Sequence, residues 1–160
     1  MSEDVIEQLG QALGARAAGL WTVGEGGLLQ VAFWAAPDLS REVADGFALA
    51  TQRVSLDQVT LGIVRAALDG LPFVSIARDL PPESGSGLWL RRFGADRSVA
   101  VPLHRDSLVI GVVSVALPGW SLSTENVIGR ISGFTALSSR AAGSPQTQSG
   151  AGRDTVCEEQ

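Results

Sequence analysis

The chain of 160 residues contains no lysine, and its formal net charge at pH 7 is −5. The only arginines that are neighbours in the sequence are Arg91 and Arg92. Nucleic-acid-binding domains of this size normally present a cationic face to the phosphate backbone. The composition therefore argues against binding to nucleic acids or to anionic membranes.

Cysteine occurs once, at Cys157, so the chain can form no internal disulfide. This usage of cysteine fits a reducing compartment. No apolar run approaches the roughly 20 residues that cross a bilayer, and the acidic start, MSEDVIEQLG, does not look like a secretory signal. We therefore expect a cytoplasmic protein without a membrane segment.

The residues that usually carry catalysis or bind metals are few and scattered. The single histidine, His104, is expected in an exposed turn and lacks the partner ligands that a metal ion needs. No pair of carboxylates is expected on one helix face beside a nucleophile, and no serine stands in a GxSxG elbow. We expect no metal, no cofactor and no enzymatic activity.

Hydrophobic periodicity and turn residues predict an α+β domain with an antiparallel sheet. Residues 78–87 are rich in Pro, Gly and Ser, which predicts a loop, and residues 143–160 contain little to bury and are expected to be disordered. This leaves a single domain at residues 1–142. The expected helices cover residues 2–13, 39–50, 57–68, 88–94 and 123–142, and the expected strands cover residues 17–23, 28–36, 72–77, 98–103 and 108–116.

The helix ends carry capping residues. Glycines follow three of the periodic runs, where a left-handed C-cap is expected, and short polar side chains precede two of them. In the helix predicted at residues 57–68, Val59, Ile63 and Ala66 are expected on the buried face. The expected C-caps are Gly14, Gly70 and Gly94, and the expected N-caps are Ser40 (or Asp38) and Ser123.

Residues 97–116, RSVAVPLHRDSLVIGVVSVA, carry the most specific pattern in the chain. Two runs rich in Val and Ile flank the polar turn 104–107, which predicts two paired antiparallel strands. In this pattern the stretch resembles the terminal hairpin of GAF domains, the small-molecule sensory modules of many signalling proteins. The run LPFVSIARDL and the segment WSLSTEN before the last helix also resemble parts of that family. A PAS or profilin-like fold would explain this hairpin less well.

The resemblance implies a central antiparallel sheet with the terminal helices on one face and short helices and a loop capping a ligand pocket on the other. Residues 81–94 would roof that pocket, where Trp89 with Arg91 or Arg92 could hold a planar or anionic molecule. Alternatively, the tryptophans are ordinary core residues. The candidate ligand-binding residues are Trp21, Arg78, Asp79, Trp89, Arg92 and Ser98.

The function that the resemblance implies is a non-enzymatic sensory or regulatory domain that binds a small molecule, a protein partner or both. A structural interaction module whose pocket is filled by its own side chains is the alternative. Some GAF proteins reduce free methionine sulfoxide through cysteines around the pocket, but residues 1–156 contain no cysteine, so this activity ranks third. The N-K-F-D-E signature of cyclic-nucleotide GAF domains is also absent, since the only asparagine is Asn126.

The terminal helices carry more apolar positions than one sheet face is expected to absorb. Val5 or Ile6 in the first helix and Ile128 in the last would remain exposed in a monomer. Exposed apolar edges on neighbouring helices suit a two-fold bundle. GAF domains commonly dimerise through these helices, so the resemblance implies a homodimer.

Overall fold

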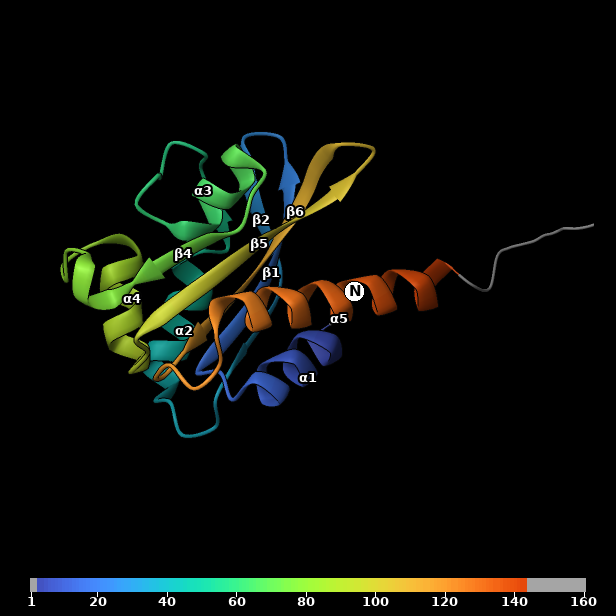
Figure 1. Cartoon of the computed structure of the whole chain (residues 1–160). Coiled ribbons are helices and arrows are strands. Elements are labelled where there is room, and N and C mark those ends of the chain that lie inside the picture. Colours follow the sequence, from blue (N-terminus) through green and yellow to red (C-terminus); the bar gives the residue numbers. More distant parts are fainter. Residues whose placement is uncertain (1–2, 144–160) are drawn as a thin grey trace, which may run out of the picture.

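The computed structural model describes residues 3–143, with side chains described through residue 136. Six strands form one antiparallel sheet in the order β3-β2-β1-β6-β5-β4 (Figure 1). The strands are β1 (Ala17–Gly24), β2 (Gly27–Ala35), β3 (Arg53–Val54), β4 (Phe73–Ile76), β5 (Arg97–Arg105) and β6 (Leu108–Leu117). The helices are α1 (Glu3–Leu13), α2 (Arg41–Ala50), α3 (Gly62–Asp69), the 3₁₀ helix η1 (Ala77–Asp79), α4 (Gly85–Phe93) and α5 (Thr124–Gly143).

The hairpin of β5 and β6 confirms the strongest sequence prediction, but its turn is shorter than expected. Asp106 and Ser107 have φ angles of 52° and 71° and form a two-residue turn whose twist matches that of the strands. The predicted turn at 104–107 is therefore wrong in its bounds. His104 lies in β5, where it pairs with Val109 and is exposed.

One face of the sheet packs against α1 and α5, which lie side by side in Figure 1. Ile6 and Ile131 from these helices are completely buried. Of the two alternatives expected to remain exposed in the first helix, Ile6 is buried and Val5 is half-buried, and Ile128 is half-buried against the same core. The two helices absorb these positions because they contact each other as well as the sheet.

The predicted caps are confirmed. All three expected C-cap glycines have left-handed backbone, as the absence of a Cβ allows. Both serines accept a hydrogen bond at 3.1 Å from the backbone N–H three residues later. These positions are Gly14, Gly70, Gly94, Ser40 and Ser123.

Helix α3 starts later than its hydrophobic pattern predicts. Residues 55–61 form successive turns, and Val59 is 49% exposed instead of facing the core. The first residue of the helix, Gly62, donates its backbone N–H to Ser86 Oγ of α4 at 3.0 Å. The start of α3 is thus capped by a residue that lies 24 positions further along the chain.

Half of the segment predicted as a loop at 78–87 lies in helices, whereas residues 80–84 form bends and turns between them as predicted. The segment begins inside η1, and α4 starts at Gly85, three residues before the predicted start. The predicted disordered tail at 143–160 lies outside the described residues except for Gly143, and Cys157 lies outside them too. Between residues 3 and 143, no helix is both long and apolar enough to span a bilayer.

Candidate functional site

The second face of the sheet bears a patch of small side chains. Pairing aligns Ala17 and Gly19 of β1 with Ala116 and Ser114 of β6, and places Ser98 of β5 opposite Ala116. Residues two apart in a strand share a face, so these side chains form one shallow floor. Larger side chains there would fill the space above the sheet.

Aromatic side chains stand around and above this floor. Phe47 of α2 lies at their centre, with its ring centroid 5.0 to 6.2 Å from those of four other aromatic rings. Three of these four contacts are edge-to-face, the arrangement that aromatic quadrupoles favour. The four partners of Phe47 are Trp21, Phe33, Trp89 and Phe93.

Between floor and roof lies a cavity, and the volume that the centres of water molecules can occupy inside it is about 50 Å³. That is room for a few water molecules. Its lining includes the floor residues, the five aromatic side chains, and Ile63, Ser86 and Leu90 from α3 and α4. The cavity therefore lies on the sheet face opposite α1 and α5, where the family resemblance implied a pocket.

The sequence-predicted site residues fall into two groups. Trp21, Trp89 and Ser98 all line the cavity. Arg78 and Asp79 lie on η1 outside the cavity. Their side chains are exposed, and Arg78 Nε lies 4.0 Å from Asp79 Oδ1. The remaining candidate, Arg92, is exposed and packs its guanidinium over the Trp89 ring, 5.1 Å from the centroid.

Sequence reasoning missed Phe47 and the floor of small residues. Phe47 was part of a helical pattern, but nothing local showed that α2 would cover the pocket. A signal for the floor was present, because small residues occupy alternate positions in β1, β5 and β6. Alternate positions in a strand share one face, so that pattern indicates a surface with room above it.

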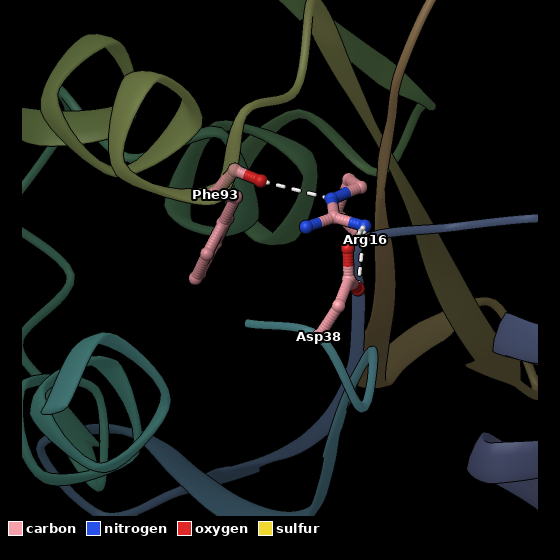
Figure 2. Close-up of polar contacts among 3 residues, drawn as sticks. All are labelled: Arg16, Asp38 and Phe93. Atoms are coloured by element: carbon pink, nitrogen blue, oxygen red, sulfur yellow. Dashed lines mark hydrogen bonds and ion pairs between the residues drawn. The ribbon is translucent and has the colours of Figure 1, made fainter. Parts of the chain in front are cut away.

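Arg16, just before β1, joins the two helices that roof the cavity (Figure 2). Its Nε donates to the carbonyl of Phe93 at the C-terminus of α4, at 3.0 Å. Its Nη1 donates to the carboxylate of Asp38, in the loop before α2, at 2.9 and 3.1 Å. A guanidinium suits this position because its fixed fork of donors can serve two acceptors at once.

The Arg16 guanidinium lowers the pKa of Asp38 from its ordinary value of 3.8, chiefly through the hydrogen bond and also through the charge. Folding thus favours the ionised carboxylate over the protonated form. The ion pair makes its full contribution to the free energy of unfolding above pH 3.8. That contribution disappears as the pH falls through the lowered, folded-state pKa. Because Asp38 is exposed, salt should weaken the ion pair.

We therefore expect Asp38→Asn to be less stable than the wild type near neutral pH, by a small amount that shrinks below pH 3.8. Urea unfolding at a series of pH values measures this difference. Glu25→Gln, in the exposed turn between β1 and β2, is the control and should not show the same convergence. A difference between wild type and Asp38→Asn that stays constant down to pH 2 would contradict the role given to Arg16.

A second charged group lies buried away from the cavity. Arg97, 1% exposed, donates from Nη1 to Thr124 Oγ1 at 3.0 Å and from Nη2 to the carbonyl of Leu122. The Trp120 ring lies 4.8 Å from its guanidinium carbon, and burial lowers the pKa of Arg97. These contacts fix the connection between β6 and α5. Arg97 thus anchors the last helix.

Within residues 3–136, whose side chains the structure describes, no group of three or more His, Cys, Asp and Glu could hold a metal ion. The groups that the cavity offers to a ligand are aromatic surfaces and hydroxyls.

Comparison with known proteins agrees with this geometry. The fold is similar to the GAF domain of a two-component sensor histidine kinase from Bacillus halodurans (10% identity, TM-score 0.60, covering 82% of this chain and 86% of that one). It is also similar to the GAF domain of a phosphoenolpyruvate-protein phosphotransferase from Coxiella burnetii (15% identity, TM-score 0.59, covering 88% of this chain and 82% of that one). A third similar structure is a type II free methionine-R-sulfoxide reductase from Thermoplasma acidophilum (12% identity, TM-score 0.55, covering 82% of this chain and 90% of that one). No curated protein matches the sequence.

These likenesses confirm the predicted α+β, GAF-like fold. The family model of the GAF domain matches residues 1–138, which covers the whole sheet and all the helices except the end of α5. The chain therefore belongs to the GAF domain family.

Proposed function

We propose that this chain is a non-enzymatic, cytoplasmic sensory or regulatory domain that binds a small molecule in the cavity and signals through a protein partner. The observation that carries the proposal is the cavity itself, with a floor of small residues beneath two helices joined through Arg16. Membership of the GAF family supports a signalling role. The neighbouring structures include the GAF domain of a sensor histidine kinase.

The floor of the cavity offers a route for the signal. Along β6, Ser114 faces the cavity, whereas Val113 and Val115 belong to the core under α1 and α5. A ligand that shifts the position of Ser114 must therefore also act on the packing of the terminal helices. The differential affinity of the ligand for the two arrangements sets the size of this effect.

Helix α2 is the element most suited to respond to a ligand. None of its residues is fully buried, although Phe47 contributes to the roof. Elements with few buried contacts open locally at low free-energy cost. A ligand that contacts Phe47 and Trp89 should hold α2 and α4 closed.

Hydrogen exchange of the full chain with a panel of small metabolites tests the proposal. We expect at least one compound to slow exchange in α2 and α4 while exchange in the exposed turn at residues 106–107 stays unchanged. If every compound leaves the two roof helices exchanging as in the free protein, small-molecule sensing is excluded for that panel. The alternative, a structural interaction module, then gains support, because aromatic side chains already fill much of the space over the floor.

Methionine sulfoxide reduction is disfavoured by the residues of the cavity. The reductase neighbours share the fold at 12 and 15% identity, but none of the described side chains that line the cavity carries a thiol. The only cysteine, Cys157, lies outside the described residues. Turnover of free methionine sulfoxide by the purified chain would overturn the non-enzymatic proposal.

We also propose that the chain forms a homodimer through α1 and α5. The proposal rests on Val5 and Ile128, which are half-buried within one chain, whereas Ile6 is buried in the core. Light scattering over a range of concentrations should report twice the monomer mass. A monomer mass at high concentration would rule the dimer out.

A further inference from the structure

The charge of the cavity lining restricts what the cavity can hold. Among the residues with described side chains, no charged residue lines it. Its surface consists of aromatic and aliphatic side chains with a few hydroxyls and backbone groups. An ion that enters such a site gives up its hydration without gaining a partner of opposite charge, which is strongly unfavourable.

Several charged side chains on the elements around the cavity are engaged in contacts of their own. Arg16 binds Asp38 and the Phe93 carbonyl, so neither member of that ion pair is free to serve a ligand. Arg91 donates to the carbonyls of Leu80 and Gly87 on the outside of α4. Arg65 stacks on the Phe73 ring with its guanidinium carbon 4.9 Å from the centroid.

Arg92 of α4 contacts the roof from the outside. Its guanidinium already covers the Trp89 ring, and the side chain is exposed. It therefore places positive charge outside the aromatic roof, where it repels a cation approaching the cavity and remains too well hydrated to bind an anion strongly.

The polar groups of the lining can form hydrogen bonds with one edge of a ligand. Ser86 Oγ accepts from the Gly62 N–H and keeps its own O–H to donate. The hydroxyls of Ser98 and Ser114 form no hydrogen bond with any residue whose side chain is described, and they stand on the floor. In contrast, the Trp21 indole N–H already donates to the Thr51 carbonyl at 2.8 Å.

On these grounds we propose that the ligand is a small, neutral, planar molecule of about one ring, with an apolar body against the aromatic roof and one polar edge on the serine hydroxyls. This inference rests on the proposed function and narrows it. The limited space sets the size, since a cavity that holds a few water molecules does not hold a nucleotide.

Three compounds of nearly equal shape test the charge requirement: benzamide, which is neutral, benzoate, which is an anion, and benzamidine, which is a cation. Titration of the full chain, followed by the amide NMR signals of Ser98 and Ser114, gives their relative affinities. We expect benzamide to bind more tightly than either ion by roughly tenfold or more, because only the ions lose hydration without compensation.

Two variants locate the binding. Ser114→Leu fills the floor and should weaken benzamide binding by roughly tenfold or more, whereas Thr22→Leu, on the exposed end of β1, should leave it unchanged. Arg92→Gln should leave benzamide binding unchanged as well. Unfolding curves of the variants separate loss of binding from loss of structure.

The outcomes distinguish this inference from the proposed function. If benzoate or benzamidine binds as tightly as benzamide, the neutral ligand class is wrong while small-molecule binding stands. If benzamide fails to bind but the metabolite panel protects α2 and α4, the inference is again wrong and the proposed function stands. If neither experiment detects a ligand, both are wrong.

Discussion

Trp21→Ala is expected to lower the free energy of unfolding by about 3–5 kcal/mol, the range for deleting a large aromatic side chain from a core. The Trp21 side chain is 1% exposed and is the largest fully buried side chain. Its ring lies against Gly19, where an added Cβ would stand 2.5 Å from the indole. Neighbouring side chains cannot fill the space left by the indole unless the surrounding structure rearranges.

Two further effects add to the lost volume. The indole N–H donates to the Thr51 carbonyl at 2.8 Å, and the alanine variant leaves that buried acceptor unpaired. The edge-to-face contact with Phe47, at 6.2 Å between centroids, is also lost, so α2 loses part of its attachment. We therefore expect faster hydrogen exchange in α2 in addition to global destabilisation.

Trp120→Ala is the matched control because it removes the same side chain from a surface position. Trp120 is 48% exposed and stacks on the Arg97 guanidinium. Its loss should cost about 2 kcal/mol, less than the loss of Trp21, because the Arg97 guanidinium that it covers is buried. Urea unfolding followed by circular dichroism compares the two variants. Equal losses would show that Trp21 does not organise the core over the cavity.

Local chemistry explains which parts of the fold could be predicted from the sequence. Helix caps depend on residues within one turn, so Ser40 and Ser123 were identified correctly. The β5–β6 hairpin was recognised because both of its strands and its turn lie within one short stretch. Only the length of its turn was wrong, because Asp106 and Ser107 adopt left-handed backbone without a glycine to signal it.

The features that were missed depend on contacts between distant segments. The start of α3 is capped by Ser86, and no local signal marks a cap supplied from α4. Phe47 reaches the cavity only because α2 folds back over the sheet. Arg16 looked unremarkable in sequence, yet it contacts Phe93, 77 positions further along the chain.

The candidate site shows the same division. The positions chosen on strands, Trp21 and Ser98, line the cavity because strand alternation fixes which way a side chain points. Arg78 and Asp79 do not, because the chain after β4 turns into η1 and carries them to the surface. The expectation of an anion-binding arginine followed from sequence proximity to Trp89, and the cavity lining contains no arginine among the described side chains.

Gly87→Ala should destabilise the protein, although Gly87 lies in the first turn of α4, where helix propensity favours alanine. Propensity alone would stabilise the variant by about 1 kcal/mol. However, a Cβ at this position would overlap the backbone carbonyl of Pro81 and stand 3.0 Å from the Leu80 Cβ. Overpacking of this kind costs about 1–3 kcal/mol, so the steric term should prevail.

The surrounding contacts leave little room for relief. A backbone carbonyl cannot rotate away as the end of a flexible side chain can, and Arg91 ties the segment to α4 through hydrogen bonds to the carbonyls of Leu80 and Gly87. The methyl group must therefore push α4 away from the 80–84 segment. Because α4 carries Trp89 and Phe93, the roof of the cavity should loosen with it.

Gly129→Ala in α5 gives the opposite expectation from the same chemical change. An added Cβ there meets nothing within 4 Å, so the variant should gain about 0.5–1 kcal/mol from reduced backbone entropy of the unfolded chain. Urea unfolding should thus move the two midpoints in opposite directions from the wild type. Hydrogen exchange should quicken in α4 of Gly87→Ala alone. A Gly87→Ala variant as stable as Gly129→Ala would show that α4 is free to move away from Pro81, and the close docking of the roof helix would then have no part in shaping the cavity.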